Sequence, residues 1–140
     1  MIRRMACLLT IGLMLSGVTA VASDSGKEGA ALSAAEKWLS IVDKREYGKS
    51  WKEAAALFRT AIEPQQWEQS VQAVRGPLGN VISRKVKAKA YKTSLPGAPD
   101  GEYVVIQFDT SFEHKKKAVE TVTPMMDKDG LWRVSGYYIK

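Results

Sequence analysis

Few side chains in this sequence could carry out chemistry. The 140 residues include a single histidine, His114, and a single cysteine, Cys7. His114 is expected at a solvated hairpin tip among lysines, so neither a histidine-based triad nor a multi-histidine metal site is expected. Thiol chemistry is excluded because Cys7 lies in a segment that we expect to be removed. We therefore predict no catalytic residue, no metal site and no cofactor.

Carboxylates are the remaining candidates for acid–base catalysis. A general acid or base in a cavity needs a carboxyl group whose pKa is raised by burial. The strand register predicted below turns Asp109, Glu113 and Glu120 away from the helices, and Asp43 lies beside two basic residues near the end of the first predicted helix. None of these residues is expected to be a poised base. A small enzyme that uses a single cavity carboxylate is the alternative.

Three threonines are predicted to lie among aromatic rings on the inward face of the sheet. Hydroxyl groups among aromatic side chains can form the sparse polar lining of a ligand pocket. The alternative is that threonine favours strands and bonds to nearby backbone, while tryptophans from the helices fill the space. The candidate pocket residues are Thr110, Thr121, Thr123, Tyr138, Phe108 and Trp132.

Two arginines lie near a glycine-rich turn at residues 75–79. Arg75 and Arg84 could hold a carboxylate or phosphate, because the guanidinium group offers paired donors. The alternative is a helix end whose free carbonyls bond to the arginines. The sequence does not separate these interpretations.

Lysines gather on the first predicted strand and at the next hairpin, at positions 85, 87, 89 and 115–117. They could face an anionic surface such as lipid headgroups or cell-wall polymer. The favoured interpretation is a solvated face that discourages edge-to-edge aggregation, with Lys87 and Lys89 pairing with Asp109 across the strands.

Apolar residues recur at helical spacing in three segments of the N-terminal half. A capping box at Ser33–Glu36 predicts the start of the first helix, and a second box at 50–53 predicts the next. Pro64 suits the first turn of a third helix, which a glycine–proline pair at 76–77 ends.

From residue 81 the apolar period becomes alternating, which predicts four strands near 81–94, 102–113, 118–126 and 131–139. Short connections make neighbours antiparallel, so the strands form a meander. The predicted fold is α+β, with three N-terminal helices packed on one face of a curved four-stranded sheet. We predict that Phe112 pairs with Val119 and Met125 with Trp132, which turns the apolar face toward the helices.

A family resemblance extends over residues 35–39, 47–58, 66–67, 75–79 with 83–84, 93–110 and 132–137. Over these stretches the chain resembles a family of exported bacterial proteins, domain of unknown function 4019, and more loosely the cone-shaped ketosteroid isomerase and nuclear transport factor 2 superfamily. The family resemblance implies export but no activity. The superfamily includes enzymes, binding modules and structural proteins, so the fold does not imply a function.

The first 22 residues have the order of a secretory signal peptide. A basic start is followed by an apolar run from Ala6 to Val21 and by small residues around Ala22, where we predict cleavage. Removal leaves 118 residues and lowers the formal charge from +6 to +4. We predict a flexible leader at 23–32 and one domain at 33–140. Without cysteines, this domain must rely on a hydrophobic core.

These observations predict a periplasmic or secreted protein with no stable membrane anchor after cleavage. Nucleic acid is not an expected partner, because no nucleic-acid-binding motif is present. The favoured function is a non-catalytic binding or accessory domain that takes a small apolar or amphipathic ligand, or a protein partner, between helices and sheet. A structural domain that acts through its outer surface is the further alternative.

Overall fold

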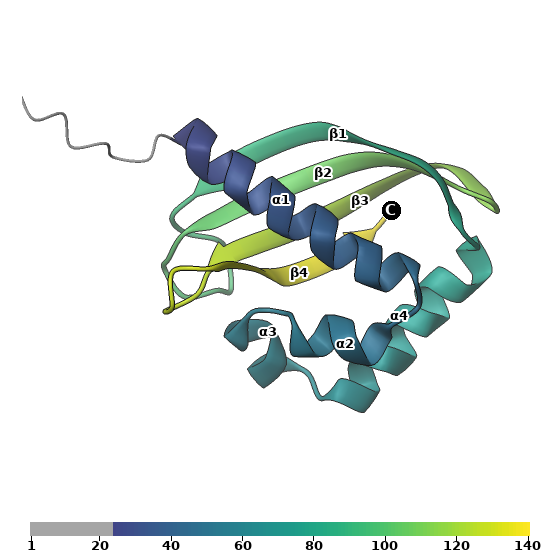
Figure 1. Cartoon of the computed structure of the whole chain (residues 1–140), viewed down its shortest axis with the longest axis horizontal. Coiled ribbons are helices and arrows are strands. Elements are labelled where there is room, and N and C mark those ends of the chain that lie inside the picture. Colours follow the sequence, from purple (N-terminus) through teal and green to yellow (C-terminus); the bar gives the residue numbers. More distant parts are fainter. Residues whose placement is uncertain (1–23) are drawn as a thin grey trace, which may run out of the picture.

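The computed structural model describes residues 24–140, and the predicted signal peptide at 1–22 lies outside the described residues. Four helices precede four strands, and α1 crosses the sheet diagonally (Figure 1). The elements are α1 (Asp24–Asp43), α2 (Tyr47–Lys52), α3 (Ala56–Ala61), α4 (Pro64–Leu78), β1 (Val81–Lys92), β2 (Tyr103–Phe112), β3 (Lys115–Met126) and β4 (Trp132–Ile139). The α+β prediction is confirmed. Within residues 24–140, none of the helices has both the length and the apolar character that crossing a membrane requires.

Helix α1 begins earlier than predicted. Residues 24–32, expected as a flexible leader, form its first turns, so Ser33 lies inside the helix and caps no terminus. Lys27 fastens this end to the sheet, because its Nζ lies 2.8 Å from a carboxylate oxygen of Glu102 and 4.8 Å from the ring centroid of Tyr91. Alanine-rich sequence favours the helix, and two fully buried alanines let it lie close to the sheet.

The second predicted helix is divided into α2 and α3. Between them Ala55 is extended, and its N–H donates to the carbonyl of Val134 at 2.8 Å. This bond to edge strand β4 replaces continuation of the helix. Trp51 bridges the break, because its indole N–H donates to the carbonyl of Ile62 at 2.9 Å.

The four strands form an antiparallel sheet in the order β1-β2-β3-β4, which confirms the predicted meander. The register between β2 and β3 differs from the prediction. Glu113 and His114 form a two-residue turn, so Phe112 pairs with Lys115 instead of Val119. The lysines expected in a loop therefore lie in β3. Away from the turn the register differs from the prediction by three residues, and an odd shift exchanges the two faces of a strand.

The predicted inward positions of Thr121, Thr123 and Tyr138 are wrong for this reason. The inward side chains of β3 include Glu120 and Val122, while Thr121 and Thr123 belong to the outer face. A register shift between Thr123 and Pro124 then places Tyr138 opposite Thr121 on that same outer face, where it is 53% exposed. Trp132 lies on the inward face, as predicted, and packs against the core.

The space between helices and sheet is filled by aromatic rings. Trp38 lies 5.9 Å from Trp67 between ring centroids, and Phe58 meets Trp67 edge-on at 4.9 Å. Trp38, Trp67 and Phe108 are buried, whereas Trp51 and Trp132 are only half-buried. The interior is therefore a packed core.

Candidate functional site

A fully buried carboxylate lies on the inward face of β3. Glu120 is 0% exposed, and Arg84 donates from Nε to its Oε1 at 2.7 Å. Thr110 donates its hydroxyl to the same oxygen at 2.5 Å, and Tyr137 donates its hydroxyl to Oε2. The carboxylate was expected to point away from the helices. The two-residue turn after β2 brings it inward instead.

A second carboxylate, Asp43 at the end of α1, extends this group. Arg84 donates from Nη1 to Asp43 Oδ2 at 2.8 Å, and Arg75 donates from Nη2 to Oδ1 at 2.9 Å. Arg75 also lies 5.0 Å from the ring centroid of Phe112. The Asp43 side chain is 27% exposed, which makes it the most exposed of the four charged side chains in this group.

We call this group the ion network, comprising Asp43, Arg75, Arg84, Thr110, Glu120 and Tyr137. Its members come from α1, α4 and all four strands. Two guanidinium groups balance two carboxylates, so the network is neutral as a unit. The predicted anion contacts, Arg75 and Arg84, thus hold carboxylates of the chain itself.

The electrostatics of the network favour this arrangement. Burial disfavours the charge on Arg84, but hydrogen bonds to Asp43 and Glu120 outweigh burial and raise its pKa. Burial and then the charge of Glu120 raise the pKa of Tyr137, which keeps its hydroxyl protonated as a donor. Each oxygen of Glu120 accepts at least two hydrogen bonds, and the residue lines none of the hollows described below. This carboxylate is built into the fold and has no open space in front of it.

An open groove runs between α1 and β4, with a volume of about 780 Å³. We call it the α1–β4 groove. Trp38 and Trp132 line it, and Leu131 at its side is 57% exposed. The other lining residues are Ala30, Ser33, Ala34, Lys37, Lys52, Glu53, Gly130, Arg133 and Val134.

Some charged side chains around this groove form ion pairs and others do not. Arg133 is held by Asp127 and Asp129 at 2.9 and 2.8 Å. Within residues 24–140, neither Lys37 nor Lys52 forms an ion pair. Two ammonium groups that have no ion-pair partner in the described residues therefore lie along the same groove as Trp132.

The predicted pocket residues are dispersed in the structure. Phe108 is in the core, Thr110 belongs to the ion network, and Trp132 lines the α1–β4 groove. Tyr138 and Arg75 line a smaller hollow of about 220 Å³ between α4 and β4. The residues that reasoning from sequence missed are Asp43, Glu120 and Tyr137. The signal for Glu120 was its place between Ala118 and Val122 in an alternating pattern.

In the part of the chain that the structure describes, no three His, Cys, Asp or Glu side chains gather as a metal site would require.

Comparison with known proteins identifies the family. The search of curated proteins finds no match. Residues 34–137 match the model of the family described as "Protein of unknown function (DUF4019)". Since this match covers most of the sequence, the chain belongs to the DUF4019 family.

Proposed function

We propose that this chain is an exported, non-catalytic binding domain that takes an amphipathic molecule in the α1–β4 groove. The ligand has an apolar body and an acidic head. One observation carries the proposal: Trp132 and the exposed Leu131 line an open groove of about 780 Å³ whose neighbouring lysines have no internal partner in the described residues. Export rests on the signal-peptide pattern of residues 1–22.

The lining favours an apolar body. Ligand sites of roughly 300–1,000 Å³ are mostly lined by apolar and aromatic side chains, with a few polar groups that fix orientation. Trp132 is half-buried and Leu131 is largely exposed, so both retain apolar surface that a ligand could cover. Ala30 and Ala34 lie one helical turn apart on α1, and their small side chains take up little space on that side of the groove.

The charges favour an acidic head. Among the described residues that line the groove, Lys37 and Lys52 outnumber Glu53, whose carboxylate forms no ion pair there. A carboxylate or sulfonate head placed between the lysines gains from both charges, at the modest strength of solvent-exposed ion pairs.

A non-catalytic role is favoured over the carboxylate-enzyme alternative. A general base must reach a proton on its substrate, directly or through a water molecule. The oxygens of Glu120 are occupied by Arg84, Thr110 and Tyr137, and Glu120 does not border the groove.

The test is a titration with decanoate and with decan-1-ol, followed by tryptophan fluorescence. Both should bind, with decanoate the tighter. The double variant Lys37→Gln/Lys52→Gln should weaken decanoate binding about five- to ten-fold and leave decan-1-ol binding unchanged. Lys128→Gln, an exposed lysine outside the groove, is the matched control. Absence of decanoate binding, or equal affinities in parent and double variant, would overturn the proposal.

Export is tested separately by N-terminal sequencing of protein recovered outside the cytoplasm. The first residue should be Ser23 or a close neighbour. Recovery only in the membrane fraction with Met1 retained would refute cleavage.

A further inference from the structure

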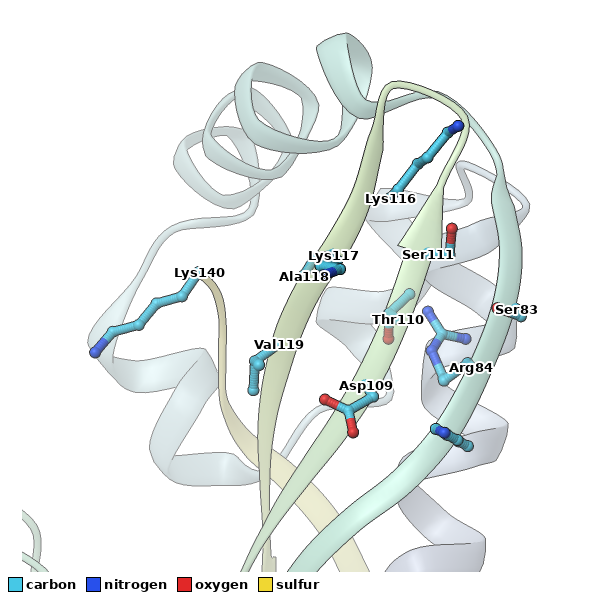
Figure 2. A pocket seen from close by; sticks show the side chains of 11 residues that line it. Ser83, Arg84, Asp109, Thr110, Ser111, Lys116, Lys117, Ala118, Val119 and Lys140 are labelled. Atoms are coloured by element: carbon cyan, nitrogen blue, oxygen red, sulfur yellow. The ribbon is translucent and has the colours of Figure 1, made fainter.

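A second hollow opens on the outer face of the sheet, the face opposite the helices, with a volume of about 640 Å³ (Figure 2). Its outward side chains come from β1, β2 and β3. We call it the outer-face hollow, defined by Ser83, Lys85, Asp109, Ser111, Lys116 and Lys117. Lys140 also borders it, but in Figure 2 its side chain extends away from the others. The groove proposed above lies elsewhere and shares none of these residues.

The hollow has an excess of positive charge. Lys85, Lys116 and Lys117 bring three ammonium groups, and Asp109 brings one carboxylate. Asp109 and Lys85 are partners in the β1–β2 register, yet within residues 24–140 none of these four residues forms an ion pair. We expected cross-strand pairs with Asp109 to neutralise this face, but the described residues form no such ion pairs. A net charge of about +2 remains for a ligand to meet.

Two hydroxyl groups add uncharged donors. Ser83 and Ser111 are Cα partners across β1 and β2, and their short side chains leave room between the lysines. In the described part of the chain, neither hydroxyl has a hydrogen-bond partner within the protein. Figure 2 shows the hydroxyl of Ser111 and the amine of Lys116 near the same end of the hollow.

The backbone around the hollow is bent and firmly held. Register shifts occur between Val81 and Ser83 and between Thr110 and Phe112, and such bulges bend strands and redirect side chains. Arg84 and Thr110 border the hollow, but their side chains bond to Glu120 on the inner face. Their main chains therefore face the hollow, and the ion network holds those main chains in place.

We propose that the outer-face hollow binds a phosphate monoester group. At neutral pH such a group carries about −1.5 to −2 charges and three acceptor oxygens, which matches the net +2 charge and the several separate donors here. Lysine binds phosphate as a point charge, so no bidentate geometry is required. The phosphate group belongs either to a free small molecule or to a lipid headgroup.

The experiment titrates the 23–140 domain with inorganic phosphate at low salt, following backbone amide shifts by NMR. In parallel, sedimentation measures binding to phosphatidylcholine vesicles with and without phosphatidic acid. Shifts should cluster around residues 83–85, 109–111 and 116–117, and salt should weaken the binding. Binding in either arm supports the proposal and identifies the source of the phosphate. Binding in neither arm overturns it.

The variants test the charge argument in both directions. Lys117→Gln should weaken binding about six- to ten-fold, and Asp109→Asn should strengthen it by about the same factor, because each removes one charge at roughly 6 Å from a group of charge about −1.5 to −2 in a solvent-exposed setting. Lys128→Gln is the control and should leave binding unchanged. Weakening by Asp109→Asn, or equal weakening by Lys117→Gln and Lys128→Gln, would overturn the site. The groove variant Lys37→Gln/Lys52→Gln should have no effect, which keeps this test separate from the proposed function.

Discussion

Replacing Arg84 with methionine should destabilise the fold by about 3–5 kcal/mol, the usual cost of removing one partner from a buried ion pair. Methionine fills a similar length but supplies no donor. Glu120, which is 0% exposed, would keep only the hydroxyls of Thr110 and Tyr137. Domains of this size have about 5–15 kcal/mol of stability in total, so Arg84→Met should remove a large share of it.

Companion variants separate the buried charge from the hydrogen bonds. Glu120→Gln removes the charge but keeps the shape, and should cost about 1.5–3 kcal/mol, the range for hydrogen bonds to charged groups. Asp43→Asn should cost about 1 kcal/mol, because the Asp43 side chain is 27% exposed and water replaces part of the loss. The double variant Arg84→Met/Glu120→Leu leaves no unpaired charge at Glu120 and should be more stable than Arg84→Met alone.

Urea unfolding, followed by tryptophan fluorescence and by circular dichroism, measures all four variants. The expected order of destabilisation is Arg84→Met, then Glu120→Gln, then Asp43→Asn. Equal losses in free energy of unfolding for Arg84→Met and Asp43→Asn would show that the buried charge of Glu120 does not dominate the cost. A double variant less stable than Arg84→Met would likewise show that the buried charge of Glu120 is not the source of the cost.

Four further predictions concern pH and packing. Because the pKa of Tyr137 is raised, the folded state keeps the Tyr137 proton above pH 10.0, while the unfolded state loses it. Stability should therefore fall as pH rises above 10. Measured by alkaline unfolding, this fall should be smaller in Tyr137→Phe. Hydrogen bonds from Arg133 lower the pKa of Asp129 from 3.8 to about 2. The contribution of Asp129 to stability is therefore present above pH 3.8 and is lost as pH falls toward 2. Asp129→Asn should flatten that part of an acid unfolding curve. Trp67→Ala should cost about 3–5 kcal/mol in urea unfolding, because it removes a core ring that also bonds to a serine hydroxyl at 2.9 Å. Ala35→Leu should cost about 1–3 kcal/mol by overpacking the fully buried contact between α1 and the sheet, and an unchanged melting temperature would contradict that close approach.

The layers of the fold follow from local sequence patterns. Helical spacing around Trp38 and Trp67 and alternation from Val104 to Phe112 are properties of single segments, so they predict buried faces without knowledge of the rest of the chain. The division of the second helix was not predictable in this way. It depends on the bond between Ala55 and Val134, which are distant in sequence.

The ion network was missed because its assembly depends on one hairpin register. Glu113–His114 carries no glycine or asparagine to mark a tight turn, and the lysines at 115–117 have the composition of a loop. A turn at this position shifts the pairing of β2 with β3 by an odd number of residues. Glu120 therefore lies on the inward face of the sheet and Thr121 on the outer face. The sequence therefore suggested threonines as the inward polar groups, whereas the inward polar group of β3 is a carboxylate. The two arginines that were candidates for an outside anion, Arg75 and Arg84, bond to Asp43, and Arg84 also bonds to this carboxylate.

The placement of the ion network also bears on where binding can occur. Because its charges balance internally, an outside anion would have to break existing pairs to reach Arg84, at the cost of leaving Glu120 or Asp43 without that partner. Hollows whose lysines have no internal partner in residues 24–140 carry no such penalty, which favours the α1–β4 groove and the outer-face hollow. The network contributes to both as a support. Arg84 fixes the main chain beside the outer-face hollow, and the Tyr137 ring, held through its hydroxyl, packs edge-on at 5.3 Å against Trp38 in the wall of the groove.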